Sequence, residues 1–599
     1  MNLPIRPATA PAPPLPGGRL RLEPLIEALL ADGVLAAEAA RRARSAAREA
    51  QARALHPLVL LADLKLPRAD TSEGGELDLE TLTQWLAARC GLSYLRIDPT
   101  RIDVPRISGL VSLAYAKNHR ILPVEVDAQR VVVATSEPLA LDWMPDLRRL
   151  LRRKIELRVA SPLDLARYTM EFHGITRSIR GAHEAKGALP GLPDLEQLVQ
   201  LGSSTELGAD DQHIVHLVDW MLQFAHEQRA SDIHLEPRRE HSQVRLRIDG
   251  VLHRVLELPT PVLTAVVARI KVLGRLDLTE RRRPQDGRIK TRSPSGREVE
   301  MRLSTMPTAF GEKCVLRIFD PDTAFKPLDQ LGFNHVEAAA WNELTCRPHG
   351  IVLVTGPTGS GKTTTLYSTL RRLATPDVNV CTIEDPIEMI APELNQMQVQ
   401  PSLDLGFASG VRTLLRQDPD IIMVGEIRDL ETAQMAIQAA LTGHLVLSTL
   451  HTNDAPSAVT RLLDLGVPHY LIASTLLGVL AQRLARTLCR KCKQPGALDP
   501  DLWRHLAGPA PVPEHALPMR PVGCIECRNT GFKGRTGLYE LMVLSPALRA
   551  RIRPEMELAP FAAAAVGEGM RTLRLAAAEK VIAGLTTIPE VLSVLPPPE

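Results

Sequence analysis

Hydrophobic residues recur at helical spacing near the start of the chain and in short strand-like runs soon after. The spacing between residues 19 and 66 favours helices, whereas residues 130–134 and 155–159 are apolar-rich runs typical of strands. The segment 142–151 between those two runs has helical character. Residues 19–173 are therefore predicted to form an N-terminal α+β domain.

The next block, residues 209–325, alternates polar and apolar residues more strictly. The run 244–248 alternates at every position and is followed by Asp249-Gly250, a pair typical of a two-residue hairpin turn. Residues 298–303 and 314–318 alternate in the same way, so charged side chains share one face of the predicted sheet. We expect a second, strand-rich α+β domain here.

A third block contains short, continuous apolar runs separated by helical segments. The runs 351–354 and 421–424 have the composition of strands that are buried on both faces. Their alternation with helices over residues 326–485 predicts an α/β core with a parallel sheet. Residues 541–599 are expected to be helical, with a separate subdomain over residues 486–540.

Two stretches interrupt this pattern. Residues 1–18 contain six prolines and two glycines and are predicted to be disordered. Residues 174–208 are punctuated by Gly, Ser and Pro and are predicted to be a linker.

The composition excludes several classes of protein. The chain is 45% hydrophobic and 23% charged, which is ordinary for a soluble protein. Its net charge of +2 and its 3% aromatic content argue against direct binding of nucleic acid. It has neither a signal-peptide core nor an apolar run near the roughly 18 residues that a membrane helix needs. We therefore expect a cytoplasmic protein without direct membrane insertion.

A glycine-rich motif directly follows the apolar run 351–354. It has the form G-x-x-x-x-G-K-[ST], between a predicted strand and a predicted helix, which is the context of a P-loop. Such a loop turns backbone N–H groups toward phosphates, its lysine reaches the β- and γ-phosphates, and its threonine hydroxyl ligates Mg²⁺. The sequence therefore predicts an ATP site formed by Gly356, Pro357, Thr358, Gly359, Ser360, Gly361, Lys362, Thr363 and Thr364.

Acidic residues follow two later strands of the same block. The run 421–424 is followed by Gly425 and Glu426, and a glycine stands where an Mg²⁺-binding aspartate is common. Because ligands bind at the carboxyl ends of parallel strands, Glu426 is the candidate that orients and activates the attacking water. We expect the missing contact to Mg²⁺ to come from the acids between Glu384 and Glu388.

Two histidines, His444 and His451, bracket the apolar run 445–450. A histidine at the end of a strand in such a sheet can contact the γ-phosphate or act as a neutral hydrogen-bonding sensor. Both are therefore candidate site residues.

Four of the eight cysteines form two C-x₂-C pairs, Cys489 with Cys492 and Cys524 with Cys527. Four thiolates in two such pairs suit a tetrahedral, structural Zn²⁺. Disulfide pairing is the alternative, and a reducing cytoplasm disfavours it.

These motifs together resemble the secretion ATPases of the type II secretion and type IV pilus assembly family. The resemblance runs from about Asp211 to about Thr587. It rests on GPTGSGKT (356–363), TIEDPIE (382–388), RQDPDIIMVGEIRD (416–429), GHLVLSTLHTN (443–453) and the paired CxxC, and also on ASDIHLEP (230–237), RRPQDGRI (282–289) and GRTGLYE (534–540).

The resemblance implies a fold and a set of roles. The fold is an N-terminal α+β domain, then a PAS-like domain, then a RecA-like P-loop NTPase domain with a zinc-binding tetracysteine insertion and C-terminal helices. The resemblance also implies a homo-hexamer, with nucleotide between the PAS-like domain and the RecA-like domain of each subunit. The resemblance assigns Walker A roles to Lys362 and Thr363, the Asp box to Glu388, catalysis to Glu426, the His box to His444 and His451, and approach to the phosphates to Arg302 and Arg317.

The function implied by the resemblance is ATP hydrolysis that drives pseudopilus assembly and protein export in type II secretion. Type IV pilus extension is the alternative, and a DNA-translocating ATPase is disfavoured by the charge and the low aromatic content. The implied partners are the cytoplasmic domain of an inner-membrane secretion protein and the inner-membrane platform protein. The chain would then be peripheral at the inner membrane.

Overall fold

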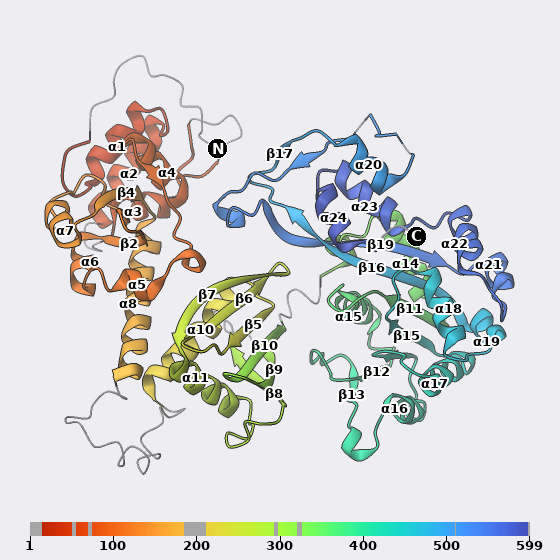
Figure 1. Ribbon diagram of the computed structural model, residues 1–599. Coiled ribbons are helices and arrows are strands. Elements are labelled where there is room, and N and C mark those ends of the chain that lie inside the picture. The colour runs from red at the N-terminus through yellow and green to blue at the C-terminus, as the bar shows by residue number, and fades with distance from the viewer. Residues whose placement is uncertain are drawn as a thin grey trace, which may run out of the picture. The chain divides into compact units, whose positions relative to one another are not determined.

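The computed structural model describes residues 15–50, 55–69, 75–184, 211–292, 298–319, 326–509, 511–514 and 516–596 (Figure 1). The chain divides into two compact units, residues 1–297 with 301–317 and residues 298–300 with 318–599. The described helices include none that is long and apolar enough to span a membrane. Most of the tail predicted to be disordered, residues 1–14, lies outside the described residues.

The first unit begins with helices packed around a small leucine-rich core. A four-stranded sheet in the order β1-β4-β3-β2 follows, and it contains both predicted strands. The elements are α1 (Leu22–Ala31), α2 (Ala37–Ala50), α3 (Pro57–Asp63), α4 (Leu79–Arg89), β1 (Ser93–Tyr94), α5 (Val104–Ser108), α6 (Leu113–His119), β2 (Ile121–Val126), β3 (Arg130–Thr135), α7 (Met144–Leu151) and β4 (Lys154–Val159).

Helix α8 (Pro162–Glu184) corrects the start of the predicted linker. The helix passes through Gly174 and continues for ten more residues. Ile175 and Ile179 explain why, since they stand four residues apart on one side of the helix and both are buried. The rest of the predicted linker, residues 185–208, lies outside the described residues.

A six-stranded sheet, in the order β7-β6-β5-β10-β9-β8, forms the rest of this unit. The predicted hairpin is confirmed: β6 and β7 pair antiparallel, with Asp249 and Gly250 at positive φ in the turn. Alternate residues of β6 are buried, which leaves Arg245 and Arg247 on the other face. The elements are α10 (Gln212–Glu227), β5 (Asp232–Glu236), β6 (His241–Ile248), β7 (Val251–Pro259), α11 (Thr260–Leu273), β8 (Gln285–Arg292), β9 (Glu298–Thr308) and β10 (Gly311–Phe319).

The second unit is built on a seven-stranded sheet in the order β13-β12-β14-β15-β11-β16-β19. Strands β11 to β16 pair in parallel, as the apolar runs predict, and β19 pairs antiparallel with β16. The strands are β11 (Gly350–Thr355), β12 (Val380–Glu384), β13 (Asn395–Gln398), β14 (Ile421–Val424), β15 (Leu445–Leu450), β16 (Leu476–Leu488) and β19 (Phe532–Val543).

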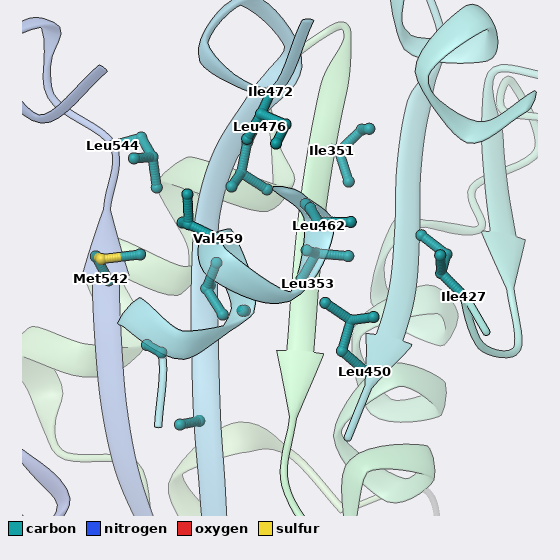
Figure 2. Close-up of a cluster of buried hydrophobic side chains, with 14 of the residues drawn as sticks. Ile351, Leu353, Ile427, Leu450, Val459, Leu462, Ile472, Leu476, Met542 and Leu544 are labelled. Carbon is teal, nitrogen blue, oxygen red and sulfur yellow. The ribbon is translucent and has the colours of Figure 1, made fainter. Parts of the chain in front are cut away.

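Helices cover both faces of this sheet, so its central strands are fully buried. Figure 2 shows one face, where Ile351 and Leu353 of β11 lie among side chains of α18 and α19. The helices are α13 (Leu328–Leu331), α14 (His335–Thr345), α15 (Lys362–Leu373), α16 (Phe407–Leu414), α17 (Leu430–Leu441), α18 (Pro456–Asp464), α19 (His469–Thr475), α21 (Pro546–Arg551), α22 (Leu558–Gly567), α23 (Leu573–Ile582) and α24 (Ile588–Val594).

The cysteine-bearing segment is an insertion between β16 and β19. The boundaries proposed for it, at residues 485 and 540, both fall inside these long paired strands. The insertion also contains β17 (Gln494–Pro495), α20 (Pro500–Ala507) and β18 (Met519–Arg520).

Candidate functional site

The glycine-rich motif forms a loop between β11 and the first turn of α15. Gly356 and Gly361 have φ values of 147° and 89°, a region that favours glycine. Helix α15 starts at Lys362, so the residues at the loop's end supply a helix N-terminus, with Thr363 exposed and Thr364 partly exposed in its first turn. The geometry is that of a phosphate-binding loop.

The side chain of Lys362 lies along this loop. Its Nζ donates to the carbonyl oxygens of Gly356 at 2.6 Å and Pro357 at 3.2 Å. Burial lowers the pKa of Lys362 to about 8, while the nearby Glu426 carboxylate raises it and Arg483 lowers it further. A phosphate placed beside this ammonium would favour its charged form.

Glu426 follows β14 by two residues and faces a histidine and an arginine. Its carboxylate lies 3.3 Å from His451 Nε2 and forms an ion pair with Arg428. Arg428 also lies 3.9 Å from Asp385, which directly follows β12. The hydrogen bond to Glu426 raises the pKa of Arg428. Residues after three neighbouring parallel strands therefore meet at one edge of the sheet.

The structure also explains the glycine that precedes Glu426. The Gly425 amide donates to the Ile383 carbonyl at 2.8 Å. A Cβ on Gly425 would lie 3.2 Å from that oxygen and 3.4 Å from Glu384 Cα. An aspartate would therefore crowd the end of β12.

The acids between Glu384 and Glu388 do not act as one cluster. Glu384 is buried and accepts hydrogen bonds from Tyr367 Oη at 2.6 Å, Thr382 Oγ1 at 2.7 Å and Gln396 Nε2 at 3.1 Å, so it is held within the fold. Glu388 lies in the loop beyond β12 and is only partly buried. Glu384 is thus held by the fold, and Glu388 stays a candidate Mg²⁺ ligand together with Thr363.

His444 and His451 lie at opposite ends of β15, and a role of either in hydrolysis stays a prediction. His451 follows the carboxyl end of β15, beside Glu426. His444 precedes the amino end, where its carbonyl accepts from Gly350 at the start of β11. Seven residues of extended chain separate them by roughly 23 Å. Two residues that flank one strand lie at opposite ends of it. The P-loop follows the carboxyl end of β11, so His444, at the amino end of β15, is remote from the P-loop of its own chain.

Arg302 and Arg317 lie on β9 and β10 of the six-stranded sheet. Arg317 Nε lies 3.1 Å from Asp232 Oδ1, and about half of the Arg317 side chain is exposed. Arg302 lies 3.8 Å from Asp286 and is 37% exposed. Both arginines are accessible side chains held by acids of their own sheet, and their approach to phosphates stays a prediction.

The four cysteines form one cluster, as predicted, with their sulfur atoms within 4.8 Å of one another. Cys489 and Cys524 Sγ lie 3.7 Å apart, as do those of Cys492 and Cys527. A disulfide needs roughly 2 Å, whereas sulfurs about 2.3 Å from a central Zn²⁺ lie about 3.8 Å apart in a tetrahedron. The donor set fits Zn²⁺, and the identity of the ion stays a prediction.

Sequence reasoning missed three residues of the nucleotide site. Arg428 carried a signal, because it stands two positions after Glu426 in the same run of residues, 416–429. Gln482 and Arg483 carried none, since Gln482 lies about 120 residues from the loop that it contacts and Arg483 lies 30 residues from Asn453. Gln482 donates to the Ser360 carbonyl at 2.8 Å, and Arg483 donates to the Asn453 carbonyl at 2.9 Å.

The family model of the type II/IV secretion system protein matches residues 208–593, which include the P-loop, Glu426 and the cysteine cluster. The chain belongs to this family. A second family model, the MshEN domain, matches residues 90–178.

Similar proteins come from two kinds of machine. The type IV pilus assembly ATPase TfpB of Acinetobacter baylyi is 51% identical over 95% of this chain and 98% of its own length. The type IV pilus assembly ATPase PilB of Myxococcus xanthus is 40% identical over 86% of this chain and 91% of its own. The type II secretion system protein E of Pectobacterium carotovorum is 41% identical over 81% of this chain and 97% of its own.

The predicted activity is therefore confirmed at the level of the family. The chain is a P-loop ATPase of the secretion and pilus-assembly class, with a largely parallel seven-stranded sheet and a tetracysteine cluster.

Proposed function

We propose that this chain hydrolyses ATP to drive the extension of a type IV pilus. The observation that carries the proposal is the match to TfpB, 51% identical over 95% of this chain, whereas the secretion protein E of Pectobacterium is 41% identical over 81%. This reverses the order of preference that the motifs suggested. Type II secretion is the second candidate, supported by relatives that carry that name.

In the proposed mechanism the loop and Lys362 hold the phosphates of ATP. The Thr363 hydroxyl and the Glu388 carboxylate would hold Mg²⁺, since hard oxygen donors suit that ion. Mg²⁺ bound there would neutralise charge on the phosphates. Glu426 orients the attacking water and accepts its proton, and His451 at 3.3 Å keeps the carboxylate in place.

Assembly and partners complete the proposal. We place Arg302 and Arg317 at the phosphates during hydrolysis, where they would stabilise developing charge within a homo-hexamer. The N-terminal domain would dock the cytoplasmic part of an inner-membrane protein, and the motor would act on the membrane platform protein. The chain would thus work in the cytoplasm, peripheral to the inner membrane.

A capture experiment tests the choice of machine. The full-length protein is presented with the purified cytoplasmic parts of pilus-type and secretion-type membrane partners from the same genome. The K362A variant, which keeps the docking domain, serves as a control for effects of nucleotide. Capture by the pilus-type partner is the expected result, and capture by the secretion-type partner alone would overturn the proposal while leaving the ATPase site intact.

A further inference from the structure

Strand β16 runs beside β11 and brings one buried amide side chain against the phosphate-binding loop. Gln482 is 2% exposed. Its Nε2 donates to the Ser360 carbonyl at 2.8 Å, and its Oε1 accepts from Thr365 Oγ1 at 2.8 Å. The same side chain therefore ties the loop to the first turn of α15, on either side of Lys362.

Gly356 and Gly361, at the two ends of the loop, also lie close to Gln482. A Cβ on Gly361 would lie 2.8 Å from Gln482 Nε2, and a Cβ on Gly356 would lie 2.5 Å from the Gln482 carbonyl oxygen. Both ends of the loop thus approach this residue more closely than any side chain at those positions would allow. The absence of a side chain at these two glycines therefore allows the loop to pack closely against β16 and also allows it to turn.

We infer that Gln482 is a positioning residue for ATP binding. It fixes the loop and the start of α15 in the arrangement in which Lys362 and the loop amides face the phosphates. A carboxamide is suited to this task because it donates at one atom and accepts at the other. Leucine offers neither group, and an ionised glutamate would set a second acceptor against the Ser360 carbonyl.

If Gln482 only stabilised the fold, its loss would lower the Tm without weakening the binding of ATP. Gln482 bonds to the loop and the helix that hold nucleotide, so its loss frees those two elements and leaves a carbonyl and a hydroxyl without their partner. In such a variant the loop and the start of α15 must become ordered when ATP binds, and the free energy of that ordering reduces the affinity for ATP. We therefore expect weaker ATP binding in addition to any loss of stability.

The test compares full-length variants by the Kd for a non-hydrolysable ATP analogue, together with the Tm. Q482L removes both side-chain bonds and should raise the Kd about tenfold, whereas T365V removes only the bond between Thr365 Oγ1 and Gln482 Oε1 and should raise the Kd by a smaller factor. The Q482L/T365V double variant should bind about as weakly as Q482L alone, because the bond that T365V removes is already lost in Q482L. T365S keeps the hydroxyl and should restore binding.

T369V is the matched control. Thr369 lies one turn further along α15, where its hydroxyl accepts from Trp341 Nε1 and donates to the Thr365 carbonyl, away from the loop. T369V should lower the Tm and leave the Kd unchanged. Q482L binding as tightly as the wild type would overturn the inference. So would T369V weakening binding as much as T365V, since general loosening of the helix would then explain the effect; T365V decides the question even if Q482L does not fold.

Discussion

The two large sheets carry their charged side chains in contrasting ways. At the carboxyl edge of the seven-stranded sheet, Glu426 and His451 come from loops after neighbouring strands and contact each other, beside Lys362. On the six-stranded sheet, Arg302 and Arg317 project from the middle of strands, and each is held by a nearby aspartate. The residues at the carboxyl edge of the seven-stranded sheet already form a site, whereas the arginines of the six-stranded sheet form a charged surface.

This difference has a consequence for function. Groups that already contact one another are pre-organised, so they need little rearrangement to act on ATP. A half-exposed arginine must exchange its aspartate for phosphate, and that exchange costs part of the energy gained. We therefore expect the edge residues to dominate hydrolysis and the arginines to add a smaller contribution.

The largest expected effect is that of E426Q. Because the amide cannot accept the proton of the attacking water, kcat should fall by about 10²–10⁴ while ATP still binds. E431Q is the matched control, since Glu431 is an exposed acid of the following helix that lies 3.7 Å from Arg412. Multiple-turnover phosphate release measures both. A fall in ATP binding that accounts for the whole loss would remove Glu426 from the chemistry.

The arginines of the six-stranded sheet should show an intermediate effect. R317A is expected to lower kcat about 10- to 100-fold, less than the ~10³–10⁵ that an arginine finger can supply, because Asp232 competes for the guanidinium. D232N should have the opposite effect and raise kcat, because it releases Arg317 from Asp232. Steady-state ATPase assays of R317A, R302A and D232N decide this, and unchanged rates in both arginine variants would leave them as a solvated surface.

The cysteine cluster should affect stability rather than chemistry. C524S should lose about one equivalent of zinc per chain and lower the Tm, because a zinc ion held by the four thiolates would link the segments that follow β16 and precede β19. C346S, which changes an exposed cysteine outside the cluster, is the control. Elemental analysis and thermal melts measure the two variants. Full zinc content in C524S would place the metal elsewhere.

A further effect on stability concerns the buried acid Glu540. Glu540 accepts from the amides of Ala455 at 2.7 Å and Leu573 at 2.9 Å, and burial raises its pKa to about 7 from the ordinary 4.5. The folded state therefore keeps a proton that the unfolded state releases between those two values. The stability linked to this proton is fully present below pH 4.5 and is lost as the pH rises through 7.

That loss amounts to about 3 kcal/mol over the interval. E540Q does not titrate, so its Tm should fall less steeply than that of the wild type between pH 5 and pH 7, even though it loses one hydrogen bond. Thermal melts across this range measure the slope. Parallel curves for the two proteins would show that Glu540 does not titrate there.

Local patterns could be predicted well from the sequence. The P-loop and Glu426 are fixed by short runs of residues at the ends of strands, and the two C-x₂-C pairs meet because β16 and β19 pair. What escaped prediction depends on tertiary neighbours. Glu384 is held by Tyr367, and Gln482 reaches a loop about 120 residues away. That His444 lies at the other end of β15 from His451 follows from the strand itself, whereas its role stays a prediction.

The most direct test of the central claim compares the two histidines that flank β15. Full-length H451A and H444A differ only in which edge of the sheet loses an imidazole. We expect H451A to lower kcat at least about tenfold, because Glu426 loses its neighbour at 3.3 Å, and H444A to stay within about twofold of the wild type. A loss of kcat in H444A as large as that in H451A would contradict the claim that the carboxyl edge alone holds the hydrolytic groups of the seven-stranded sheet.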